Sequence, residues 1–367
     1  MNAIFFLLIL TLLVLVHELG HFLIAKKNGV RVDEFGIGFP PKIFGKKIGE
    51  TLYSINLLPF GGFVKIFGEN AESLEEGDVK VDPSRSLVHK SKFVQAAVLS
   101  GGILFNILFA WLTITFGLMV GLPMSANGND GLEVNSQRLM ITSVLPESPA
   151  DLAGIKPGDV ILSLSDDLSG KSIKENLNPD SAHDFIVGSK GELEIDLKRG
   201  EKQFTSKVEA KEGLVSGNRA IGISMDMIGN LKLPIYKAVT TGFVMTVRLL
   251  EEVTASILSF FKDVIFGKPD LTSVAGPVGM VTIFGDNRNL GFGFIVFFIA
   301  LLSANLAIIN LMPLPALDGG RLVMVLIEAI KRSPINPKVV QVVNTVGFIL
   351  LIGLMFVITY HDIVKLF

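Results

Sequence analysis

Four long apolar runs divide the chain. They cover residues 3–25, 94–122, 292–311 and 339–359. About 20 residues, each rising about 1.5 Å along a helix, are enough to cross the hydrocarbon core of a bilayer. The pattern therefore predicts four transmembrane helices.

A different pattern fills the region between the second and third runs. Residues 127–226 are polar and rich in Gly, Asp and Lys, and they alternate apolar with polar side chains, as in LEIDL at residues 193–197. Such alternation between turn residues is typical of β-strands, and about 100 residues suffice for one domain. We therefore expect an inserted domain rich in strands.

Two other segments have weaker patterns. Residues 235–265 are apolar but are interrupted by charged side chains, which favours an amphipathic helix in the membrane interface over a fifth span. Residues 36–39 and 51–65 contain glycines and favour short extended segments. Because backbone at membrane depth must be paired or line a wet cavity, we expect these segments to form a re-entrant β-hairpin region.

Composition indicates a membrane protein and argues against several other classes of protein and of metal site. Of the 367 residues, 49% are apolar and only 19% are charged, and the mean hydropathy is +0.54. The net charge of −2 gives no indication of nucleic-acid binding, and the lack of cysteine excludes disulfides and thiolate metal sites. The first apolar run has no basic start and no small-residue cleavage site, so we interpret it as a retained span.

Basic residues predict the orientation in the membrane. Residues 26–92 contain eleven Lys and Arg, and the loop at residues 331–338 is also basic. Basic loops remain in the cytoplasm, so both chain ends and the inserted domain are expected outside it. A fifth span at residues 235–265 would place the 331–338 loop on the side that its charge disfavours.

The first apolar run contains the pentapeptide HELGH, with His17, Glu18 and His21. On a helix the two histidines lie four residues apart on one face, where they can share one zinc ion, and Glu18 can take a proton from water. Ionisable groups inside a membrane span are costly and mark functional sites. The motif points to hydrolytic zinc chemistry within the bilayer.

A second polar motif follows the third run. Residues 310–320 have the sequence NLMPLPALDGG, in which two prolines break the helix before Asp318. A catalytic zinc site commonly uses three protein ligands and one open position, and Asp318 is the expected third ligand because it should reach the depth of HELGH. Asn310 is expected to bind a substrate carbonyl or the negative charge that develops on it. Asn106, in the second run, is expected to form a hydrogen bond between helices.

Together, HELGH and N-x-x-P-x-P-x-L-D-G resemble the motifs of the site-2 protease family of intramembrane zinc metalloproteases. The nearest resemblance is to its bacterial envelope-stress branch, the sigma-E proteases. The likeness extends to FGIGF at residues 35–39 and PFGGFVK at residues 59–65, and it covers nearly the whole chain. It implies one Zn²⁺ held by His17, His21 and Asp318, Glu18 as general base, and Asn310 near the reacting bond.

The inserted domain looks like a PDZ domain. Residues 148–162 resemble its helix, turn and strand, and Ile221, Gly222 and Ile223 match the loop that binds a peptide terminus in the bacterial, circularly permuted arrangement. Some members of this branch carry two tandem PDZ domains, whereas residues 127–226 have room for one. This difference puts a size filter built from two domains in doubt here.

The resemblance implies a substrate class and a partner. Members of the family cleave single-span membrane proteins, such as anti-sigma factors and signal-peptide remnants, after an upstream site-1 protease has cut the same substrate. A helical peptide bond is shielded, so the substrate must unwind before water can attack it. We expect the hairpin region, with Asn56, Gly61 and Gly62, to hold the substrate extended at an edge strand.

The expected architecture is a polytopic α-helical membrane protein with about four transmembrane helices, a re-entrant β-hairpin region and an inserted extracytoplasmic α+β PDZ-like domain. The expected parts are an N-terminal membrane half (1–125), the PDZ-like domain (126–228), an interfacial linker (229–290) and a C-terminal membrane half (291–367). The chain would reside in the bacterial inner membrane, surrounded by lipid, with its active site toward the cytoplasm.

Two alternatives are considered. A catalytically silent membrane adaptor would bind peptide termini through the PDZ-like domain, but such a protein has no use for the base Glu18. A metal transporter would be expected to carry polar residues along several spans, or inverted repeats, and neither is found.

Overall fold

A computed structural model describes residues 2–69, 82–126, 134–215, 218–267, 275–287 and 291–364. The chain forms two compact units. The first, here called the membrane unit, comprises Met1–Ile114, Thr241–Thr282 and Phe298–Phe367. The second, called the β unit, comprises Thr115–Thr240 and Ile283–Phe297. Each unit is described by itself.

Four helices in the described residues are long and apolar enough to cross a membrane. They are α1 (Asn2–Lys27), α2 (Lys92–Val120), α7 (Phe292–Leu311) and α9 (Pro337–Val364). This confirms the four predicted runs, although the helices extend a few residues beyond several of them. α2 is continuous through the Gly101-Gly102 pair.

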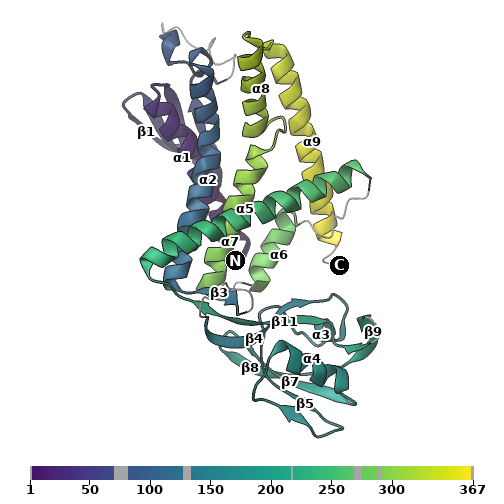
Figure 1. Cartoon of the computed structure of the whole chain (residues 1–367). Coiled ribbons are helices and arrows are strands. Elements are labelled where there is room, and N and C mark those ends of the chain that lie inside the picture. Colours follow the sequence, from purple (N-terminus) through teal and green to yellow (C-terminus); the bar gives the residue numbers. More distant parts are fainter. Residues whose placement is uncertain are drawn as a thin grey trace. The chain divides into compact units, whose positions relative to one another are not determined.

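Three further helices lie wholly or mostly in the membrane unit: α5 (Ile235–Ile265), α6 (Pro277–Asn287) and α8 (Asp318–Lys331). Figure 1 shows α5 strongly inclined to α7 and α9. Its buried positions recur every three or four residues at Thr246, Leu249 and Val253, as expected for an amphipathic helix. α5 is absent from the candidate spans, in agreement with the sequence prediction.

The C-terminal part of α9 is hydrogen-bonded to the N-terminal end of α6. The Asp362 carboxylate accepts hydrogen bonds from the backbone N–H groups of Gly276 and Gly279, at 3.3 and 2.8 Å. Gly276 directly precedes α6, and Gly279 lies in its first turn, where N–H groups have no partner within the helix. The last span thus caps α6.

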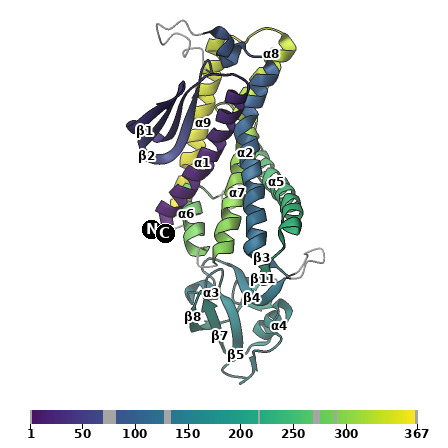
Figure 2. The same ribbon diagram turned by 90° about the vertical axis from the view of Figure 1, so that its left-hand side faces the viewer.

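Strands β1 (Val32–Ile48) and β2 (Thr51–Ile66) form a long, irregular hairpin that lies beside α1, as Figure 2 shows. Residues 42–48 pair with residues 51–56, and residues 34–37 lie between residues 52–55 and residues 62–65. The hairpin therefore folds back on itself, and its described edges are residues 42–48 and 62–66. The extended segments predicted at 36–39 and 51–65 are confirmed, but they belong to longer strands.

The tight turn of this hairpin is tied to the end of α1. The Glu50 carboxylate accepts from Lys26 Nζ at 2.7 Å and from the Arg85 guanidinium, also at 2.7 Å. Hydrogen bonds from these two cations lower the pKa of Glu50 to about 2, and the bond from Arg85 has the larger effect. Arg85 lies in a short 3-10 helix, Pro83–Arg85, so three segments meet at one carboxylate.

The β unit contains a seven-stranded sheet in the order β3-β11-β4-β5-β7-β8, with β6 paired to β5. Its strands are β3 (Leu122–Ser125), β4 (Asn135–Val144), β5 (Val160–Asp166), β6 (Ser172–Ile173), β7 (Glu192–Arg199), β8 (Lys202–Glu209) and β11 (Ile223–Leu231). A separate hairpin consists of β9 (Lys211–Val215) and β10 (Asn218–Ala220).

The core of the β unit follows from the alternation in its sequence. Leu193, Ile195 and Leu197 on β7 are fully buried and pack with apolar side chains of α3 (Pro149–Leu152) and α4 (Pro179–Gly188). Side chains on a strand alternate between its two faces, so LEIDL places one apolar face toward these helices. The predicted β-rich domain is confirmed.

Candidate metal centre

The two histidines of HELGH lie on one face of α1 and are buried, with 8% and 6% of their surface exposed. α2 packs directly against this face at a glycine. A Cβ atom on Gly102 would lie 2.5 Å from both His17 Cε1 and His21 Nε2. Only glycine leaves room for the two rings at this position.

Asp318 comes to the same place from the start of α8. This helix begins immediately after the proline-containing loop, and its glycines allow it to approach the loop closely. A Cβ on Gly319 would lie 2.2 Å from the Met312 carbonyl oxygen, and one on Gly320 would lie 2.1 Å from that of Leu314. The LDGG sequence thus folds the aspartate back against the end of α7.

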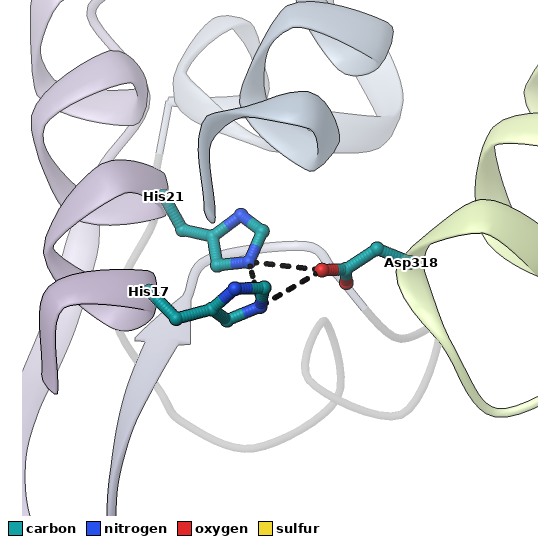
Figure 3. A group of neighbouring side chains, drawn as sticks. All are labelled: His17, His21 and Asp318. Atoms are coloured by element: carbon teal, nitrogen blue, oxygen red, sulfur yellow. Dashed lines mark hydrogen bonds and ion pairs between the residues drawn. The ribbon is translucent and has the colours of Figure 1, made fainter. Parts of the chain in front are cut away.

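The structure brings His17, His21 and Asp318 together, as Figure 3 shows. His17 Nε2 lies 3.0 Å from Asp318 Oδ2, His21 Nε2 lies 3.2 Å from the same oxygen, and the two Nε2 atoms are 3.1 Å apart. Three ligand atoms from two helices, 301 residues apart in sequence, therefore form a nearly equilateral triangle.

The chemistry of this triangle fits a cation. His21 Nδ1 lies 2.8 Å from the Val98 carbonyl oxygen; because a carbonyl only accepts, the neutral ring carries its proton on Nδ1 and presents the Nε2 lone pair toward Asp318. Acceptor atoms this close repel one another unless positive charge lies between them. Tetrahedral zinc with ligands at about 2.0–2.1 Å would separate them by about 3.3–3.4 Å, close to the observed sides of 3.0–3.2 Å.

Glu18 lies between this triangle and the hairpin. Its carboxylate is near enough to His21 and Asp318 to interact with their charges, and it lies close to the backbone N–H of Val64. Val64 is in the 62–66 edge of the hairpin. An acid of the HELGH motif and a strand edge are therefore adjacent.

The predicted hairpin residues contact the hairpin itself and α1. The Asn56 side-chain amide donates to the Gly38 carbonyl oxygen at 3.1 Å, so it supports the bend of β1. A Cβ on Gly62 would lie 2.8 Å from both the Gly36 carbonyl oxygen and Leu15 Cδ2. The backbone N–H of Gly61 donates to Thr11 Oγ1 at 3.2 Å.

Thr11 is a contact that the sequence analysis missed. Its hydroxyl lies 2.7 Å from the Pro59 carbonyl oxygen and 2.8 Å from the Leu7 carbonyl oxygen, and it accepts from the Gly61 N–H. One buried hydroxyl thus joins α1 to the turn before the 62–66 edge. No sequence signal distinguishes this threonine from any other in a span.

Asn310 is half-buried, one residue before the end of α7. Its amide makes no hydrogen bond among the described residues. Asn106, predicted to bond between helices, is fully buried on α2, and its side-chain nitrogen lies 3.3 Å from His17 Nδ1. Its partner is therefore a ring of the HELGH motif.

The loop of Ile221, Gly222 and Ile223 lies in the β unit, at the start of β11. The carbonyls of Ile221 and Gly222 accept from the N–H groups of Ala150 and Leu145, at 2.9 and 2.8 Å. Gly222 has φ of +83°, a value that favours glycine. The loop lines a groove of about 370 Å³, whose other side is formed by His183 and Ile186 of α4 together with residues 143–146.

Comparison with known proteins extends over nearly the whole chain. The sequence profile of peptidase family M50 matches residues 5–354, which include both motifs. A Clostridium perfringens protein named as a candidate zinc metalloprotease is 38% identical over 369 residues, covering 99% of each chain. The zinc metalloprotease RasP of Oceanobacillus iheyensis is 29% identical, covering 99% of this chain and 98% of the relative. The regulator of sigma-W protease RasP of Bacillus subtilis is 29% identical, covering 100% and 99%.

Proposed function

This chain belongs to peptidase family M50, and we propose that it is an intramembrane zinc endopeptidase that cuts single-span membrane proteins within or near the bilayer. One observation carries the proposal. Three ligand atoms from HELGH and LDGG converge at 3.0–3.2 Å, where α1, a candidate membrane span, meets the start of α8. Such an arrangement requires a cation in a place where water is scarce.

In this proposal His17, His21 and Asp318 hold one zinc ion, which supplies positive charge to activate water and to polarise the scissile carbonyl. Two imidazoles and one carboxylate match the ligands that zinc prefers, and three protein ligands leave a position open. The close relatives whose names specify zinc support this choice of metal.

Glu18 is the proposed general base. It takes a proton from the attacking water and then delivers that proton to the leaving amine. Its position supports this role, because the same carboxylate is near the triangle and close to the Val64 N–H. A group placed between the metal ligands and a strand edge can reach both the water and the scissile bond.

The 62–66 edge is the proposed support for an extended substrate. A backbone edge can pair with a peptide added as a further strand, and pairing would expose a peptide bond that a helix shields. Gly61 and Gly62 bring this edge against α1, while Asn56 stabilises the bend beside it. Asn310 is proposed to bind the substrate near the reacting bond, since its amide is free of other described partners.

The β unit is proposed to be a PDZ-like domain on the extracytoplasmic side. The amides of Gly222 and Ile223 would receive a peptide carboxylate, and the apolar groove beside α4 would receive its last side chain. The basic residues of 26–92 support a cytoplasmic placement of the active site in the bacterial inner membrane; Lys80, one of them, lies outside the described residues. Anti-sigma factors and signal-peptide remnants, left by a site-1 protease, are the proposed substrates.

The test is cleavage of a tagged single-span protein in cells by the wild type and by Glu18→Gln. Glutamine keeps the size of the side chain but cannot act as base, so we expect cleavage to fall by about 10²–10⁴-fold. Zinc content of the two purified proteins should be equal, which separates loss of the base from loss of the metal. Equal cleavage by both would overturn the mechanism, and cleavage by neither would favour a silent adaptor.

A further inference from the structure

One face of α2 contacts both rings of the HELGH motif. Val98, Gly102 and Asn106 are spaced four residues apart, so they lie in one row along the helix. Gly102, in the middle, is in contact with both rings. Val98 lies one turn before it and contacts His21, and Asn106 lies one turn after it and contacts His17.

The Asn106 side chain has an unusual environment. The residue is fully buried, and its Nδ2 lies 3.3 Å from His17 Nδ1. Its Oδ1 has no hydrogen-bond partner in the part of the chain that the structure describes. A buried amide with one unpaired atom costs about 1–3 kcal/mol, so a stable helix pair retains it for a reason.

The proton on His17 decides how this amide is oriented. If His17 Nε2 is a metal ligand, it carries a lone pair, and the ring proton must be on Nδ1. An N–H cannot donate to the amide nitrogen that faces it. Rotating the amide by 180° exchanges oxygen and nitrogen without moving any other atom. Either orientation leaves one amide atom unpaired, but only the rotated one gives the His17 proton an acceptor.

We propose that Asn106 is a positioning residue whose Oδ1 accepts the Nδ1–H of His17. The Val98 carbonyl already accepts the corresponding proton of His21 at 2.8 Å. α2 thus supplies an acceptor to each ring and turns both Nε2 atoms toward Asp318. The inference rests on the proposed metal site and extends it to a residue outside both motifs.

The backbone carbonyl of Asn106 has a partner of its own, separate from the side-chain amide. Ser303 Oγ, on α7, donates to the Asn106 carbonyl oxygen at 2.8 Å, and Ser303 is fully buried. A histidine ligand whose second nitrogen is bound to an acceptor is oriented and more basic, which is worth about 10–100-fold in metal affinity. Asn106 is therefore expected to affect the metal through His17.

The test measures zinc affinity of the purified full-length protein in detergent, by competition with a chelator, so that activity is not the readout. Asn106→Leu has a similar size but no acceptor, and we expect zinc affinity to fall about 10–100-fold. Asn106→Asp keeps an oxygen acceptor and has no amide N–H, so it should bind zinc at least as tightly as the wild type. Ser303→Ala, the matched control, removes a hydrogen bond from α7 to the backbone of Asn106 without touching its side-chain amide, and it should leave zinc affinity unchanged.

Each outcome decides a different point. Equal affinity of the wild type and Asn106→Leu would overturn the inference. An Asn106→Asp variant as weak as Asn106→Leu would also overturn it, because the amide nitrogen would then be the important group. If Ser303→Ala lost zinc to the same extent, general helix packing would explain the effect and the inference would fail. A wild type that binds no zinc would instead overturn the proposed function.

Discussion

Both units of the molecule bury carboxylates, but they surround them differently. In the β unit, Asp159 is fully buried and forms two hydrogen bonds with the Arg199 guanidinium, each 2.7 Å long. Asp166, 3% exposed, accepts from the backbone N–H groups of Leu168, Lys190 and Gly191. Both acids face donors, so their charge is neutralised from within the fold.

In the membrane unit Asp318 faces two imidazole nitrogens, which are acceptors in the neutral rings. A buried acid that faces donors stabilises the fold, whereas one that faces acceptors requires a cation from outside. The difference distinguishes a structural carboxylate from a candidate metal ligand, although both are buried acids in the same chain.

The largest effect is expected from removing a member of the triangle. Asp318→Ala should lose zinc and lower cleavage at least about a thousandfold, because several kcal/mol of barrier lowering disappear with the metal. Metal analysis of the purified variant, together with cleavage of the tagged substrate, checks this. Asp159→Asn is the matched control: it changes a buried acid of the β unit and should leave zinc content intact. Retention of zinc by Asp318→Ala would remove the distinction between the two acids.

The next effect concerns the ion pair of the β unit. Arg199→Met leaves Asp159 buried without its partner, and we expect the β unit to lose on the order of 2–4 kcal/mol of stability. Hydrogen exchange of the β5 and β7 amides in the intact protein measures this loss. Zinc affinity should not change. Unaltered exchange would show that the pair contributes little to the stability of the unit.

A smaller effect is expected at Thr11 of the membrane unit. Its hydroxyl has hydrogen-bond partners within the fold, as the buried acids of the β unit have. Thr11→Val removes the hydroxyl that joins α1 to Pro59 and Gly61, and kcat/KM should fall about three- to tenfold, since each lost hydrogen bond costs about 1 kcal/mol. Thr11→Ser keeps the hydroxyl and should restore activity. Zinc content should be equal in both. Activity of Thr11→Val at the wild-type level would mean that the contact does not position the edge.

The smallest effect appears only in acid. Backbone N–H donors, of which that of Lys190 has the largest effect, lower the pKa of Asp166 to about 2. The pKa of an unfolded aspartate is about 3.9. The stabilisation is therefore complete above about pH 4 and is lost as the pH falls toward 2. Protection of the β5 and β7 amides should decrease across this range, and Asp166→Asn should flatten the dependence. A pH profile identical in the variant would assign the change to other groups.

Much of the site could be predicted because its parts are local in sequence. The spacing of His17 and His21 places both on one helix face wherever the helix lies, and the prolines before Asp318 interrupt α7 as predicted. The prediction of an enzyme of the site-2 protease type is confirmed by the match to peptidase family M50. The roles of the individual residues remain predictions.

Other features depended on which faces meet. The contact of Asn56 with substrate stays a prediction, and the hydrogen bond of its amide to the Gly38 carbonyl oxygen within the hairpin was not foreseen. The contacts of Thr11 were not predicted, and the bond between helices that was expected of Asn106 was predicted without its partner, His17. A single polar residue in an apolar helix gives no sign of the helix or turn that it faces. The placement of residues 34–37 between two parts of β2 was also missed, since strand pairing joins residues far apart in the chain.

The helices, the β-rich insertion and the chemical character of the site can be read from local patterns, because hydrophobic period and residue type act over a few neighbouring positions. The meeting of Asp318 with the HELGH histidines at 3.0–3.2 Å, and the packing of α2 behind both rings, depend on the three-dimensional fold. These contacts join segments up to 301 residues apart. They are fixed by how closely glycine faces allow helices to pack, which no local pattern specifies.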